Sequence, residues 1–277
     1  AALLRTLRAR LRATLEAGPT APGPTFPAAE ADALCTRLHL ERDLRTALAD
    51  HQLELHAQPI VALPDGRAVW HELLLRWNHP NRGLLNPGAF LGLAEERGLM
   101  CELGSWTPRK AAQIAHEGTD VSVNLSAQHL QSGRLAEEIR EICTTTGIAP
   151  PRLQLELTET ALVADPDAAS AAIEALRALG CRVALDDFGS GYSAFTYLQR
   201  FPFDVLKLDK SLVDDLAVDA RARSIVTALN GLARDLGLEL VAEGVERPEQ
   251  LQVLRVLGIG LAQGFHFGRP APLNASA

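Results

Sequence analysis

Residues 153–187 read LQLELTETALVADPDAASAAIEALRALGCRVALDD and contain two short apolar runs separated by a helical pattern. The first run covers 153–157, the helical pattern covers 166–179, and the second run, RVALDD, covers 182–187. Apolar runs that alternate with helices are typical of a parallel sheet with helices packed outside it. This segment therefore predicts an α/β fold.

The same alternation continues over most of the chain. Helices are expected from about 28 to 48 and over 221–236 and 248–257. Further runs that favour strands lie at 53–60, 68–77, 121–125, 205–209 and 238–244. No dinucleotide-binding or Walker glycine motif follows any of these runs. Seven or eight such units in about 240 residues fit a (β/α)8 TIM-like barrel.

The first 27 residues differ in composition from the rest. Leucines recur at helical spacing over 1–17 with arginines between them, which predicts an amphipathic helix. Proline and glycine in 18–27 indicate a linker. Such a helix can bind a membrane surface or a partner helix, but we favour the tail of a preceding domain or a signalling helix. The predicted organisation is an N-terminal helix and linker over 1–27 and one globular domain over 28–277.

Composition excludes several classes of protein. Hydrophobic residues make up 47% of the 277 positions, enough for a large core and too many for a disordered chain. No run approaches about 18 consecutive apolar residues, so no membrane span is expected. The net charge of −7 argues against binding to duplex nucleic acid. Four widely spaced cysteines predict reduced, mostly buried thiols and a cytoplasmic location, with any membrane anchor in a region outside this sequence.

Polar residues interrupt the apolar runs in a repeated way. They are Glu72, Asn124, Glu156, Asp186, Asp187, Lys207 and Glu243. A charge buried in a strand is costly unless it is paired or binds a metal. Because the carboxyl ends of parallel barrel strands meet at one face, we expect these side chains to converge there.

The residue types in this set indicate a site for hard cations. Carboxylate and amide oxygens without His or Cys suit Mg²⁺ or Mn²⁺ better than Zn²⁺. Asp186 and Asp187 are adjacent at a strand end and point in different directions, so one use of the pair would be for Asp186 to bridge two ions and for Asp187 to bind the second. Two ions about 3.5–4 Å apart are a common device for phosphodiester cleavage by water.

Each of these residues also has a simpler interpretation. A single Glu in a strand usually faces solvent or lies at an edge, although the apolar neighbours of Glu72 argue against that. Asp186 and Asp187 could belong to a turn or a helix cap, and Lys207 could pair with Asp209. The joint occurrence across six runs favours a shared site.

The segments that carry these residues resemble the EAL-domain family of bacterial cyclic-di-GMP phosphodiesterases. The matching segments are LHAQPIVAL (55–63), ELLLRW (72–77), VSVNLSAQHL (121–130), LQLELTET (153–160), VALDDFGSGYSAFTYL (183–198), DVLKLDKS (204–211), LVAEGVE (240–246) and QGFHFGRP (263–270). They follow the family order from about residue 35 to 272. The resemblance implies a modified (β/α)8 barrel whose first strand runs antiparallel to the others.

The resemblance also implies roles for individual residues. One metal would be held by Glu72, Asn124, Glu156 and Asp186, and a second by Asp186 and Asp187. Lys207 would orient or deprotonate the attacking water, with Asp187 and Glu243 beside it in the catalytic set. Substrate contacts would come from Gln58, Leu74, Arg76 and Gln263. Glu159 would anchor the loop from Phe188 to Ser193.

The implied reaction is hydrolysis of cyclic-di-GMP to linear pGpG, which ends or tunes a second-messenger signal. Two Mg²⁺ or Mn²⁺ ions would support it, and Ca²⁺ would inhibit. A homodimer and an upstream sensory or regulatory domain are also expected. No metal position is replaced, but Leu73 stands where the family signature has alanine. Strand alternation predicts that Leu73 faces the outer helices rather than the site.

Three other functions remain open from the residues. A receptor that binds cyclic-di-GMP without cleaving it would differ in turnover alone. A Mg²⁺-dependent barrel that abstracts a proton next to a carboxylate could use Lys207 as its base, although the Asp186–Asp187 pair favours the phosphodiesterase. A pure interaction domain would leave the polar strand residues unexplained.

Overall fold

The computed structural model describes residues 28–116, 118–163, 165–189 and 194–273. The chain divides into two compact units, 1–46 and 47–277. Helix α2 (Ala28–Ala47) belongs almost entirely to the first unit, and its bounds agree with the predicted helix. The helix and linker expected over 1–27 lie outside the described residues, and the domain boundary at residue 28 stays a prediction.

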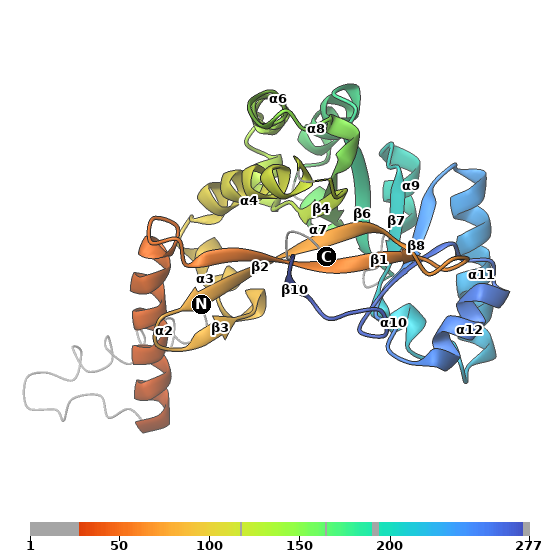
Figure 1. Cartoon of the computed structure of the whole chain (residues 1–277), viewed down its shortest axis with the longest axis horizontal. Coiled ribbons are helices and arrows are strands. Elements are labelled where there is room, and N and C mark those ends of the chain that lie inside the picture. Colours follow the sequence, from red (N-terminus) through yellow and green to blue (C-terminus); the bar gives the residue numbers. More distant parts are fainter. Residues whose placement is uncertain (1–27, 117, 164, 190–193, 274–277) are drawn as a thin grey trace, which may run out of the picture. The chain divides into compact units, whose positions relative to one another are not determined.

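Eight strands of the second unit close into a barrel (Figure 1). They are β1 (Leu53–Ala62), β2 (Ala68–His79), β4 (Val121–Asn124), β5 (Leu153–Thr158), β6 (Arg182–Phe188), β7 (Val205–Leu208), β8 (Glu239–Ala242) and β9 (Leu261–Gln263). Strand β1 pairs antiparallel with both β2 and β9, and the remaining neighbours pair in parallel. The predicted barrel with one antiparallel strand is confirmed.

Two short strands extend the barrel wall. Strand β3 (Gly83–Leu85) pairs with the end of β2, and β10 (Ala271–Pro272) pairs with β1. All seven strand runs predicted from the sequence are present. Strand β9 was missed because three residues are too short to show an alternating pattern.

Helices surround the strands (Figure 1). The longer ones are α4 (Met100–His116), α6 (Leu135–Thr146), α8 (Pro166–Ala178), α9 (Ala194–Arg200), α11 (Ala220–Asp235) and α12 (Pro248–Val256). Short helices are α3 (Leu91–Glu96), α5 (Ala127–Leu130), α7 (Glu159–Val163) and α10 (Lys210–Val213), with 3-10 turns at Pro87–Ala89 and Pro150–Arg152. Helix α8 begins at a cap in which Asp165 accepts a 3.0 Å hydrogen bond from the Ala168 amide.

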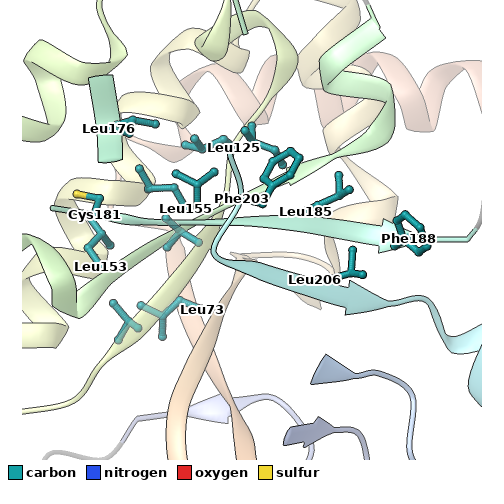
Figure 2. Packing of buried hydrophobic residues seen from close by; sticks show 14 of the residues in the cluster. Leu73, Leu125, Leu153, Leu155, Leu176, Cys181, Leu185, Phe188, Phe203 and Leu206 are labelled. Atoms are coloured by element: carbon teal, nitrogen blue, oxygen red, sulfur yellow. The ribbon is translucent and has the colours of Figure 1, made fainter. Parts of the chain in front are cut away.

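The main core lies between the strands and the outer helices and is largely aliphatic, with Phe188 and Phe203 among the leucines (Figure 2). Leu73 is 1% exposed and belongs to this core, together with Ala111, Ala112 and Ala115 of α4. The predicted outward register of Leu73 is therefore confirmed.

A second apolar cluster fills part of the barrel interior. Its buried members are Ile60, Trp70, Ala184, Val205 and Val241. Two residues further along β2, β6 and β7, the side chains are Glu72, Asp186 and Lys207. Because side chains alternate along a strand, these polar residues face the same interior one layer closer to the carboxyl ends.

Two further observations bear on the cellular setting. None of the described helices is long and apolar enough to cross a membrane. Of the three cysteines whose side chains are described, Cys143 and Cys181 are buried free thiols, as predicted, while Cys101 is exposed. Burial raises the pKa of Cys181 to about 12.

Candidate functional site

Lys207 lies at the centre of the polar layer and is 1% exposed. Its Nζ is 2.6 Å from Glu156 Oε2 and 2.7 Å from Glu243 Oε1. Asp186 Oδ1 lies at 3.1 Å and Glu72 Oε2 at 3.4 Å from the same nitrogen. Strands β2, β5, β6 and β7 and the residue after β8 thus deliver one ammonium and four carboxylates to one point.

Amide side chains fix the carboxylates around this point. Asn124 Nδ2 donates to Glu72 Oε1 at 2.7 Å, and Gln263 Nε2 donates to Glu72 Oε2 at 2.7 Å. Gln154, which sequence reasoning missed, donates its Nε2 to Glu156 Oε1 at 3.2 Å. Its position two residues before Glu156, on the same strand face, is the signal that would have found it.

The predicted alternative that pairs Lys207 with Asp209 is wrong. Asp209 instead precedes α10 and accepts a 3.0 Å hydrogen bond from the Ser211 amide, as a helix cap does. The partners of Lys207 are instead four carboxylates from other parts of the barrel, Glu72, Glu156, Asp186 and Glu243.

Asp187 and Glu159 lie at the edge of this layer. Asp187 has φ of 56°, a backbone conformation that costs energy for a residue other than glycine. Glu159 Oε1 accepts a 3.3 Å hydrogen bond from the amide of Gly189, the second residue after Asp187. The loop that Glu159 is expected to anchor continues over 190–193, which lie outside the described residues.

Burial and the neighbouring charges shift the pKa values of the ionisable side chains in this site. Burial opposes the charge on Lys207, but the surrounding carboxylates raise its pKa well above the ordinary value. Burial raises the pKa of Glu156 to about 7 and that of Glu243 well above its usual range. Burial and two neighbouring aspartates raise the pKa of Asp187 to about 6. Burial alone would raise the pKa of Glu72, but Lys207 and the amide hydrogen bonds hold it below its ordinary value.

The carboxylates fit a pair of divalent cations. Ligand oxygens of Glu72, Glu156 and Asp186 lie within 4.8 Å of one another, and so do those of Asp186, Asp187 and Glu243. Asp186 belongs to both groups, as expected for a bridging ligand. Four carboxylates contact the single ammonium, and Asp187 adds a fifth beside them, so the fully ionised set carries four negative charges in excess, which two divalent cations would neutralise. Oxygen ligands alone suit Mg²⁺ or Mn²⁺.

A cavity of about 290 Å³ opens beside this layer. Its lining residues are Gln58, Glu72, Leu74, Lys210, Glu243, Gly244, Glu246, Gln263, Gly264 and Phe265. Three of the four predicted substrate contacts are therefore in the wall. The fourth, Arg76, is buried outside that wall and donates to the Leu75 carbonyl at 2.8 Å. Lys210, Glu246 and Phe265 were not predicted.

A family model described as the EAL domain matches residues 41–270. The chain belongs to the EAL-domain family. The resemblance stated from the sequence motifs is therefore confirmed, and it extends over the whole barrel.

Relatives of this EAL domain are larger signalling proteins. Cyclic di-GMP phosphodiesterase NbdA of Pseudomonas aeruginosa is 44% identical over 245 residues, which cover 86% of this chain and 31% of that protein. Cyclic di-GMP phosphodiesterase RocR of the same species is 37% identical over 237 residues, which cover 83% of this chain and 60% of that protein. The chain spans about a third of the length of several curated relatives that it matches.

Solved EAL structures share the fold. A PaMucR phosphodiesterase in complex with c-di-GMP superposes with a TM-score of 0.80 at 40% identity, covering 85% of this chain and 98% of that one. The EAL domain of Mycobacterium smegmatis DcpA gives a TM-score of 0.65 at 30% identity, covering 78% of this chain and 90% of that one.

Proposed function

We propose that this EAL domain hydrolyses one phosphodiester bond of cyclic di-GMP to give linear pGpG. The observation that carries the proposal is the ionic layer, by which we mean Lys207 with the carboxylates of Glu72, Glu156, Asp186, Asp187 and Glu243. Every family position in it is filled, and Glu72 and Glu243 line the adjacent cavity. The relatives named cyclic di-GMP phosphodiesterases and the c-di-GMP complex of PaMucR supply the substrate.

Two cations complete the proposed site. Glu72, Asn124, Glu156 and Asp186 would hold the first ion, and Asp186 and Asp187 the second. When bound, divalent cations polarise phosphoryl oxygens and make water more acidic. The same carboxylates repel a phosphate when no cation is present, so the proposed substrate binding depends on metal.

Lys207 orients the attacking water in this proposal. Its pKa lies well above the ordinary value because carboxylates surround it, so the amine stays protonated at neutral pH. A protonated amine donates hydrogen bonds and cannot accept the proton of the water. In this proposal the proton therefore passes to a carboxylate, and Glu243, whose Oε1 lies 2.7 Å from Lys207 Nζ, is the one placed beside it.

In this proposal Gln58, Leu74 and Gln263 contact the substrate from the cavity wall. Arg76, which lies outside that wall and donates to the Leu75 carbonyl, would have to exchange that hydrogen bond for a phosphate. Glu159 holds the loop after Asp187 through the Gly189 amide. The homodimer and the upstream regulatory domain, suggested by the family and by the length of the relatives, complete the proposal.

Turnover separates this function from that of a cyclic di-GMP receptor. The chain is incubated with cyclic di-GMP and Mg²⁺ or Mn²⁺, and pGpG is quantified by liquid chromatography. We expect pGpG with either ion, none after chelation, and inhibition by Ca²⁺, which prefers longer bonds and more ligands. Asp186→Asn is the control that removes the shared carboxylate. Binding of cyclic di-GMP without pGpG would support the receptor and contradict the phosphodiesterase.

A further inference from the structure

Phe265 differs from the other residues of the cavity wall because a large aromatic ring is left 46% exposed. The guanidinium carbon of Arg269 lies 4.1 Å from the centre of that ring, within the range of a cation–π contact. Single apolar side chains are commonly exposed on proteins, so it is the place of this ring in the wall of the cavity beside the ionic layer that suggests a ligand contact.

The position of Phe265 is fixed by a tightly packed turn. A Cβ at Gly264 would lie 2.1 Å from the carbonyl oxygen of Val245, so the two backbones are in direct contact. The amide of His266 donates to that same oxygen at 3.0 Å. The ring is therefore held in place before any ligand arrives, which lowers the entropy cost of binding.

The same turn connects the ring to the ionic layer. Gln263, which donates to Glu72 at 2.7 Å, precedes Phe265 by two residues. Two residues span at most about 7 Å of extended chain. Phe265 therefore lies within reach of the sugar and base of a nucleotide whose phosphate is at the ionic layer.

We propose that Phe265 and Arg269 form a stacking surface for one base of the dinucleotide. The inference rests on the proposed function, which places a phosphate of cyclic di-GMP at the ionic layer. Both the ring and the guanidinium are flat, and proteins hold unpaired bases by stacking on such planes. Stacking adds affinity for the ground state and the transition state alike, so it lowers KM and leaves kcat unchanged.

A purely structural role predicts a different outcome. If Arg269 only covered Phe265 from water, replacing either residue would change the melting temperature and leave KM unchanged. The test therefore compares Phe265→Leu, which keeps an apolar side chain and removes the aromatic plane, with Phe265→Tyr, which keeps the plane. Arg182→Ala is the matched control, because Arg182 stacks on Trp70 at 5.2 Å in the apolar part of the barrel.

The experiment measures KM and kcat with Mg²⁺, and also Kd for cyclic di-GMP by calorimetry with Ca²⁺ in its place. Phe265→Leu should raise KM and Kd about 5- to 150-fold, which is about 1–3 kcal/mol, with kcat unchanged. Arg269→Ala should give a smaller rise in both. Phe265→Tyr and the Arg182→Ala control should keep the wild-type KM and Kd.

Two results would overturn the stacking surface: wild-type KM and Kd in Phe265→Leu, or a loss confined to kcat. Equal losses in Phe265→Leu and Phe265→Tyr would also overturn it, because the aromatic plane would then be irrelevant. A wild-type chain that binds cyclic di-GMP without turnover contradicts the proposed hydrolysis, and the Kd values still decide the role of Phe265.

Discussion

The two layers of the barrel interior come from the same strands and differ in chemistry. One layer is apolar and consists of Ile60, Trp70, Ala184, Val205 and Val241. The next layer toward the carboxyl ends places Lys207 among carboxylates. Only Leu206 separates Val205 from Lys207 along β7, so the change occurs within a single step of the strand pattern.

This difference separates stability from function. Apolar side chains in the first layer gain about 25 cal/mol for each Å² removed from water. Ions in the second layer lose several kcal/mol each in desolvation, which only good pairing offsets. A chain selected for stability alone would have continued the apolar layer, so the ionic layer is explained by what it binds and not by folding.

Removing Lys207 should have the largest effect on the ionic layer. Lys207→Met should lower turnover about 10²- to 10⁴-fold, because the water is no longer positioned. Without cations it should also lose about 3–5 kcal/mol of unfolding free energy, since three buried carboxylates and the partly buried Glu243 lose their partner. Urea denaturation with and without Mg²⁺, beside pGpG formation, measures both.

Lys110→Met is the matched control, because Lys110 is an exposed lysine on α4. It should match the wild type in both measurements. Turnover of Lys207→Met near the wild-type rate would refute the role of Lys207.

Trp70→Ala tests the apolar layer. The cavity left in the interior should cost about 3–5 kcal/mol of unfolding free energy. At a temperature where the variant remains folded, with saturating Mg²⁺, turnover should stay within about tenfold, or 1.4 kcal/mol of barrier. A variant of normal stability with sharply reduced turnover would show that the two layers are not separable.

Leu73→Ala tests the outer core at the position where this chain departs from the family signature. Leu73 is 1% exposed on the helix side of β2, so the substitution should cost about 2–5 kcal/mol. Turnover should change by less than about tenfold. Thermal melting and pGpG formation together give the answer, and unchanged melting with altered turnover would place Leu73 in the site.

Protons and cations compete for the same carboxyl groups, so the affinity for cations should depend on pH. Glu156 has a pKa of about 7 and Asp187 of about 6, above the ordinary values of 4.5 and 3.8. Without metal the folded chain therefore binds more protons than the unfolded chain, and stability falls as pH rises through about 4 to 7. Cations need the ionised groups, so their affinity rises over the same range.

Calorimetry at pH 5.5 and pH 8 checks the sign of this effect. The Kd for Mg²⁺ should be roughly tenfold or more weaker at pH 5.5. Equal values at the two pH values would show that neither carboxyl titrates on binding.

Local pattern was sufficient for much of the fold and for the candidate site residues. The run RVALDD predicted β6 and the direction of Asp186, because alternation along a strand is a local property. The partners of Lys207 were not predictable from alternation, because they depend on closure of the barrel across four other strands. The near neighbour Asp209 looked equally suitable in sequence and caps α10 instead.

The cavity wall shows the same limit. Arg269 lies over the ring of Phe265 because a tight turn brings them together, and no periodicity marks that turn. Strand β9, which carries Gln263 to Glu72, is too short to be recognised by pattern. Contacts between backbone segments that are distant in sequence cannot be predicted from local sequence patterns.

The most direct test counts cations and product in the same samples. Metal-free chain is dialysed against increasing Mn²⁺, bound Mn²⁺ per chain is measured, and pGpG formation is followed at each point. Two ions per chain are predicted, with turnover rising as the second binds, and Asp186→Asn should lose both. Full turnover with one bound ion or none would contradict the account of the ionic layer as a two-cation hydrolytic site.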